Sequence, residues 1–168
     1  MDPLFIWIES SALSTWLVQS PSLWAFPFVL ILHTVGLAIF VGANVAWDVR
    51  VLGLGRGVPM DALERVFLVM WIGFWINAIS GVLLLIAYPT KALTNPLFYV
   101  KLALIGAGVA ATLQLRTLAR RLPAADGDAV PTGLKLLAAG SLACWVAVIF
   151  AGRFLAYTYT RLTVDSFC

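Results

Sequence analysis

The fold is decided by residues 23–45, which read LWAFPFVLILHTVGLAIFVGANV and contain no charged side chain. A helix of this length rises about 34 Å at 1.5 Å per residue, and about 20 apolar residues are enough to cross the hydrocarbon of a bilayer. Three more stretches of similar length and character follow at 66–88, 96–118 and 134–156. The sequence therefore predicts four transmembrane helices.

The composition agrees with a single membrane domain that occupies residues 1–168. Apolar residues make up 62% of the chain and charged residues 11%, whereas a soluble domain has about 25% charged residues. The net charge of +3 comes from cations scattered among the loops, which indicates membrane topology and not nucleic-acid binding. We expect an all-α four-helix transmembrane bundle that is embedded in the lipid bilayer and has the bilayer as a binding partner.

Residues 1–20 form a separate amphipathic segment. Phe5, Ile8, Ala12 and Trp16 recur at helical spacing, and tryptophan favours the boundary between lipid and water. Residues 20–22, Ser-Pro-Ser, then interrupt the chain before the first span. These features predict an interfacial helix at the N-terminus.

Three polar side chains fall at similar estimated depths inside the spans. Counting along each predicted helix places His33, Asn77 and Cys144 ten or eleven residues from a membrane surface, which is about 15 Å and close to the midplane. One face of the first span carries His33, Gly36, Phe40 and Asn44. The second span has a similar face, which carries Met70, Gly73, Asn77 and Gly81. Two interpretations stay open for His33: a ligand for a metal or haem, or a packing contact hydrogen-bonded to Asn77. Cys144 is likewise either a metal ligand or a small buried apolar residue.

A second polar layer lies nearer the outer surface. Lys101 lies about five residues into the third span and Arg153 about three residues from the end of the fourth, with Tyr157 one turn further on. Both cations are placed either to snorkel to lipid headgroups or to hold an anionic group such as a carboxylate or phosphate.

The two layers together suit a haem b, with iron on His33 and propionates on Lys101 and Arg153. Because the chain has one histidine, such a haem is five-coordinate or is shared by two protomers. Copper is the other candidate, bound by His33 with Cys144 or a methionine. The carboxylates Asp48, Asp61 and Glu64 are expected at or beyond the inner membrane edge, so no catalytic pair or triad is predicted inside the membrane.

The sequence around His33 resembles known membrane families. Leu32-His33 with Gly36 and Gly42 downstream, the Asp48 to Gly53 stretch, and Ala151-Gly152-Arg153 are similar to a family of uncharacterised bacterial four-span integral membrane proteins, over the whole chain. The first span alone resembles, more distantly, the membrane part of copper-resistance D-type proteins and four-span haem-linked oxidases of the protoporphyrinogen pathway. The resemblance implies a bacterial inner-membrane protein with a haem or copper role for His33.

Three classes of function are compatible with these features. The first is a redox or cofactor-binding membrane protein that uses His33, and the second is a cofactor-free accessory subunit of a larger membrane complex. The third, a small transporter, has less support because the spans offer few polar residues to line a solute pathway. In each class we expect association with other copies or other subunits, and no independent enzyme activity is indicated.

The flanking cations predict the topology. Seven lie on one side of the spans, namely Arg50, Arg56, Arg65, Arg116, Arg120, Arg121 and Lys135, and four on the other, namely Lys91, Lys101, Arg153 and Arg161. By the positive-inside rule both termini face the periplasm. A reporter active only in the cytoplasm should therefore be active when fused after Ala125 and silent when fused after Cys168, and activity at Cys168 would contradict this orientation.

Overall fold

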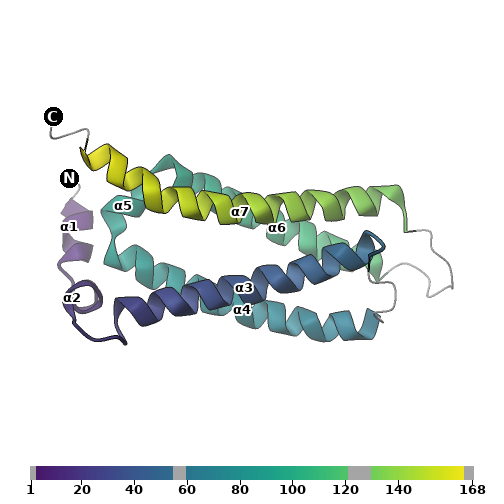
Figure 1. The fold of residues 1–168 in the computed structure, drawn as a ribbon, viewed down its shortest axis with the longest axis horizontal. Coiled ribbons are helices and arrows are strands. Elements are labelled where there is room, and N and C mark those ends of the chain that lie inside the picture. Colours follow the sequence, from purple (N-terminus) through teal and green to yellow (C-terminus); the bar gives the residue numbers. More distant parts are fainter. Residues whose placement is uncertain (1–2, 55–59, 121–129, 165–168) are drawn as a thin grey trace.

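A computed structural model of the chain describes residues 3–54, 60–120 and 130–164, and in them every regular element is a helix. The four long helices are α3 (Phe26–Val51), α4 (Met60–Ala87), α6 (Pro96–Ala119) and α7 (Thr132–Val164). They lie side by side as an elongated bundle (Figure 1), and each contains a stretch long and apolar enough to cross a membrane. The predicted all-α four-helix bundle is confirmed, and the chain is an integral membrane protein.

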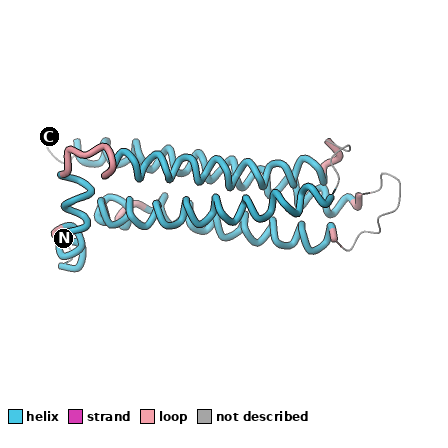
Figure 2. Tube along the Cα trace, turned by 90° about the horizontal axis from the view of Figure 1, so that it is seen from below, coloured by secondary structure: helices cyan, strands magenta, loops and turns pink. Residues whose placement is uncertain are grey.

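The bundle consists of two helix pairs. Helix α3 packs along α4 and α6 packs along α7, and a contact between α3 and α7 joins the pairs. The short helix α5 (Pro89–Leu93) connects α4 to α6 at the end of the bundle where both chain termini lie (Figures 1 and 2). We call this the terminus end and the opposite end, where α3 leads to α4 and α6 leads to α7, the loop end.

Helix α3 is displaced relative to the predicted first span. It begins at Phe26, with a proline in its first turn, and continues to Val51 instead of ending at Val45. A proline is tolerated at a helix start because the first N–H groups have no partner within the helix. The extension adds Trp47 and Asp48 to the helix, and both are buried.

Helix α6 begins where the sequence predicted. Asn95 caps it, since its side-chain oxygen accepts a hydrogen bond from the Leu97 N–H at 3.0 Å, and Pro96 occupies the first turn. The predicted flanking cations Arg56 and Arg121 and the fusion sites Ala125 and Cys168 lie outside the described residues, as do the side chains of Asp61 and Arg161.

The N-terminal segment forms two short helices where one was predicted, α1 (Pro3–Glu9) and α2 (Ala12–Gln19). The break occurs at Ser11, whose hydroxyl accepts a hydrogen bond from the Ser14 N–H at 3.3 Å and so starts a new helix. Both lie across the terminus end (Figure 1), held by buried Leu17 against α3 and α4 and by the Thr90 hydroxyl, which donates to Glu9. Trp7, Trp16 and Trp24 are exposed at this end, as expected of aromatic side chains at a membrane boundary.

Two apolar clusters fill the bundle. The cluster toward the middle contains Phe40, Val41, Ala43, Phe67, Met70, Trp145 and Val148. The cluster toward the loop end contains Trp47, Val51, Leu115, Ala119, Leu134 and Ala138.

Three glycines set the distance between α3 and α4. A Cβ atom on Gly36 would lie 2.7 Å from the backbone nitrogen of Asn77, and one on Gly73 would lie 2.8 Å from the backbone nitrogen of Phe40. Near the terminus end, a Cβ on Gly81 would lie 3.1 Å from Cε1 of His33. The two polar faces predicted on these spans therefore do face each other, and their small residues allow the backbones to touch.

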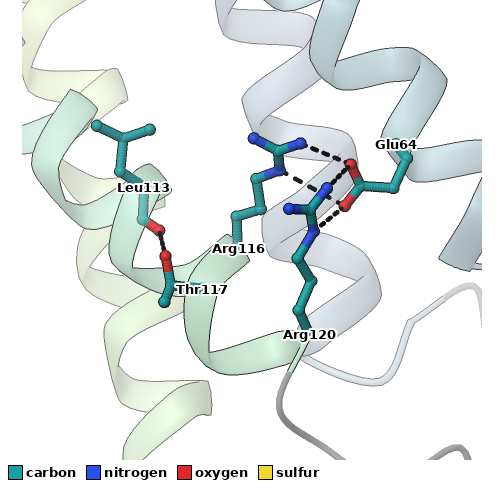
Figure 3. A network of polar contacts seen from close by, with 5 residues as sticks. All are labelled: Glu64, Leu113, Arg116, Thr117 and Arg120. Carbon is teal, nitrogen blue, oxygen red and sulfur yellow. Dashed lines mark hydrogen bonds and ion pairs between the residues drawn. The ribbon is translucent and has the colours of Figure 1, made fainter.

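At the loop end, Glu64 of α4 is clamped by two arginines of α6 (Figure 3). The Arg116 guanidinium donates to Glu64 Oε2 at 2.7 Å and the Arg120 Nε–H donates to Oε1 at 2.8 Å. Arg116 also covers the Phe67 ring, with 3.7 Å between Cζ and the ring centroid. Hydrogen bonding to Glu64 raises the pKa of Arg120 above its ordinary value. The clamp ties α4 to α6 where the helices leave the bundle.

Because Gly36 has no room for a side chain, Gly36→Leu should separate α3 from α4 and lower the free energy of unfolding by about 1 to 3 kcal/mol, the usual cost of overpacking. Gly42→Leu is the matched control, since nothing lies within 4 Å of a Cβ on Gly42. Unfolding followed in mixed detergent micelles measures both. Equal losses in the two variants would show that helix contact is not what Gly36 provides.

Candidate functional site

His33 lies in the half of α3 nearer the terminus end. It comes seven residues after the first residue of α3, or about 10 Å along the helix axis. The sequence predicted a position near the midplane. The difference arises because α3 starts three residues later than the predicted span and runs six residues further at its other end.

One ring nitrogen of His33 is held by α4. Its Nδ1 lies 3.0 Å from the Asn77 carbonyl oxygen and 3.2 Å from the Ser80 hydroxyl. A carbonyl oxygen only accepts hydrogen bonds, so the shorter contact, with the Asn77 carbonyl, requires the proton on Nδ1. The Asn77 amide nitrogen lies 3.3 Å from the same ring nitrogen and would be its donor in the other tautomer. The Asn77 amide in turn donates to the His33 carbonyl oxygen at 2.8 Å. The predicted His33–Asn77 contact is confirmed, and the ring is fixed in one orientation.

The other ring nitrogen, Nε2, makes no hydrogen bond with any described residue. Nε2 is not fully enclosed by the protein. It therefore borders accessible space. With the proton on Nδ1, Nε2 carries the lone pair. This is the arrangement of a metal-ligating histidine, which donates through one nitrogen to a carbonyl and binds through the other.

Lys101 of α6 brings a positive charge to the same layer. Its ammonium is close enough to His33 to act on it electrostatically, and its Nζ would lie 3.9 Å from a Cβ on Gly152 of α7. Lys101 is half-buried, and no described residue pairs with it. All four spans therefore contribute to this layer.

The other predicted site residues lie elsewhere. Arg153 and Tyr157 are exposed on α7, Tyr157 to 66%, which is the geometry of side chains that reach toward headgroups. The Cys144 thiol donates to the Leu104 carbonyl oxygen at 3.1 Å, and Met70 is buried in the central apolar cluster. The structure thus brings together His33, Asn77 and Lys101.

Among the described residues, no group of three or more His, Cys, Asp or Glu side chains is placed to hold a metal ion. The groups that could hold a cofactor in this layer are the His33 imidazole and the Lys101 ammonium.

Asp48 was expected at or beyond the membrane edge. It lies three residues from the end of α3, inside the helix, and only 1% of its surface is exposed. The expectation treated a charged residue as the end of a span, whereas neighbouring helices shield this one from lipid. Asp48 lies one turn beyond Asn44, so extending the polar face of the first span by four residues would have found it. Ser80, which contacts His33, was also missed.

Comparison with known proteins finds no matching family model, curated protein or solved structure.

Proposed function

We propose that the protein is a haem b-binding subunit of a bacterial inner membrane, in which His33 would hold the haem iron through Nε2. The observation that carries this proposal is the state of the imidazole: Nδ1 donates to the Asn77 carbonyl oxygen and Nε2 has no partner among the described residues. The resemblance to haem-linked and copper-linked four-span proteins in the first span is in keeping with it. The terminus end then faces the periplasm, and the haem lies in the outer half of the membrane.

The residues around His33 have distinct tasks in this proposal. The Asn77 carbonyl and the Ser80 hydroxyl hold the imidazole ring, and the hydrogen bond at Nδ1 makes Nε2 a better electron donor. Lys101 supplies the positive charge for a propionate, in a layer from which water is largely excluded. A bound haem supplies one-electron redox chemistry.

One protomer offers one histidine, which leaves two forms of the complex. In the first, His33 of a single protomer would be the protein ligand of the haem. In the second, His33 of one protomer and His33 of its partner would hold the same haem in a homo-oligomer. The two forms differ in spin state and in haem content per chain, so the absorption spectrum distinguishes them.

A second candidate, the cofactor-free accessory subunit, is favoured by the outward face of α6. This face exposes Gln114 within a span and a row of small residues, which are Ala103, Gly106, Ala107 and Ala110. A polar side chain facing lipid is unfavourable, and small residues allow another helix to approach. A partner helix on α6 would satisfy both features and is compatible with either function.

His33→Ala should abolish the haem absorption of protein purified gently from its native membrane, while the helices still insert, because removing an imidazole lowers the cost of insertion. Thr34→Ala is the control: Thr34 is exposed and its hydroxyl donates only within its own helix. Absorption spectra and a pyridine haemochrome assay provide the measurement. If the wild-type protein carries neither haem nor metal, the ligand role is wrong and the accessory-subunit function takes its place.

Lys101→Met should reduce haem retention roughly tenfold, in line with the loss of one charge-assisted hydrogen bond, whereas Lys101→Arg should restore most of it. Arg153→Leu should have little effect, because Arg153 is exposed on the outside of α7. The ratio of haem to protein after extended washing in detergent measures retention. A larger loss with Arg153→Leu than with Lys101→Met would assign the propionate contact to α7 instead.

A further inference from the structure

A different polar layer, separate from the one that contains His33 and Lys101, crosses the bundle toward the loop end. Asn44 and Asp48 of α3, Thr112 of α6 and Ser141 of α7 are each at most 4% exposed. On all three helices these residues come between members of the two apolar clusters: Phe40 precedes them and Val51 follows them on α3, and Ala138 and Trp145 flank Ser141 on α7. The layer is therefore closed by apolar side chains on both sides.

Two side chains of this layer, Asn44 and Thr112, have hydrogen-bond partners within the protein. The Thr112 hydroxyl donates to the Asn44 side-chain oxygen, and the Asn44 amide donates to the Phe40 carbonyl oxygen at 2.7 Å. The other two side chains, Asp48 and Ser141, do not have one among the described residues. Both carboxyl oxygens of Asp48 and the hydroxyl of Ser141 are enclosed without a hydrogen-bond partner, although the Ser141 hydroxyl lies beside the carboxyl.

Two enclosed donors lie in the apolar clusters on either side of this layer. The indole N–H groups of Trp145 in the central cluster and of Trp47 in the loop-end cluster are buried and make no hydrogen bond with the described residues. Buried polar atoms are almost always paired, so a carboxyl whose two oxygens are both enclosed without a partner indicates a site with an occupant.

The occupant must carry one positive charge. An ionised carboxylate enclosed between apolar clusters is costly unless its charge is neutralised. The charged residues that the structure describes at this end are Arg50 on α3, Glu64 and Arg65 on α4, Arg116 and Arg120 at the end of α6, and Lys135 on α7. Arg116 and Arg120 are both engaged by Glu64. Ser141 is the single described side chain that acts on the carboxyl. Within the described part of the chain, no cationic side chain donates a hydrogen bond to the Asp48 carboxyl.

A proton fits this site better than a metal cation. Hard cations such as Mg²⁺ and Ca²⁺ need about six or more oxygen ligands, and the unpaired oxygens here belong to one carboxyl and one hydroxyl. The unpaired indole groups are donors and cannot ligate a cation. A proton needs only one carboxyl oxygen, and the resulting O–H group can donate to the Ser141 oxygen.

We propose that Asp48 is a buried proton-binding site at the contact of α3 with α7, independent of any haem at His33. When the proton is released, the O–H bond breaks, its electron pair stays on the carboxyl oxygen, and the proton passes to water that enters from the loop end. Asp48 lies three residues from the end of α3, or about 4.5 Å along its axis. The ionised Asp48 carboxylate is unstable in a layer without water. Release of the proton therefore hydrates or loosens the contact between α3 and α7.

Infrared spectroscopy in an ester-free detergent tests the proposal. The wild-type protein at neutral pH should show the carbonyl stretch of a protonated carboxyl, which shifts in D₂O and is lost in Asp48→Asn. Ser141→Ala should keep the band but move it to higher wavenumber, because one hydrogen bond of the carboxyl is gone. Glu9→Gln, at an exposed acid of the terminus end, should leave the band unchanged.

Thermal unfolding supplies a second readout. The wild-type protein should lose stability as the pH rises above about 4, where the Asp of the unfolded chain releases its proton while the folded state still holds it, and the loss should level off once the folded state also releases its proton. Asp48→Asn carries a neutral side chain of the same shape, so this part of the pH dependence should disappear. If Asp48→Asn does not fold, the D₂O shift and the Ser141→Ala shift still decide the matter. Absence of the band at neutral pH, or its loss on adding Na⁺ at constant ionic strength, would overturn proton binding, and the second result would assign an alkali cation instead.

Discussion

The close contact of α3 with α4 is the interaction on which the rest of the structure depends. In a bilayer no hydrophobic force drives two apolar helices together, so their association relies on van der Waals contact and on interhelical hydrogen bonds. Gly36 and Gly73 let the two backbones meet, and the Asn77 amide then reaches the His33 carbonyl oxygen at 2.8 Å. The same approach brings the Asn77 carbonyl to Nδ1 of His33. A wider separation of these helices would leave the imidazole without an orientation.

The second helix pair depends on the first through aromatic packing. Phe40 of α3 meets the Trp145 ring edge-on, with 4.7 Å between the ring centroids. Trp145 in turn occupies the space left by Gly108 of α6, where a Cβ would lie 2.8 Å from the indole ring. One bulky side chain thus joins α3, α6 and α7. Because Phe40 lies on the face of α3 that Gly36 fixes, the position of α7 follows from the contact between α3 and α4.

Much of this arrangement could be predicted from the sequence. Hydropathy indicates which residues lie within the membrane, and helical periodicity indicates which residues share one face of a helix. The four spans, the shared face of His33 and Phe40 and the contact with Asn77 were all accessible in this way. Rotation around a helix relative to distant neighbours was not. Lys101 and Arg153 have similar estimated depths, yet Lys101 is half-buried beside Gly152 of α7 and Arg153 is exposed. Gly152 faces Lys101, and one step along the helix turns the next side chain by about 100°. The end of α3 was misjudged for a related reason, since hydropathy does not distinguish a charged residue in water from one enclosed by other helices.

The two polar layers lie at opposite ends of α3 and are separated by apolar side chains. Fifteen positions separate His33 from Asp48, or about 22 Å along the helix. Phe40, Met70 and Trp145 fill the interval. Such a barrier contains no chain of polar groups along which a proton could pass from one layer to the other. Any influence of one layer on the other must therefore travel through the position of α3 itself, which contacts α4 beside His33 and α7 beside Asp48. Loosening of the contact between α3 and α7 would alter the surroundings of Trp145 first. It would reach the imidazole only if α3 also slid against α4, and the glycine contacts at Gly36 and Gly73 oppose that movement. The packing therefore favours two sites that operate independently.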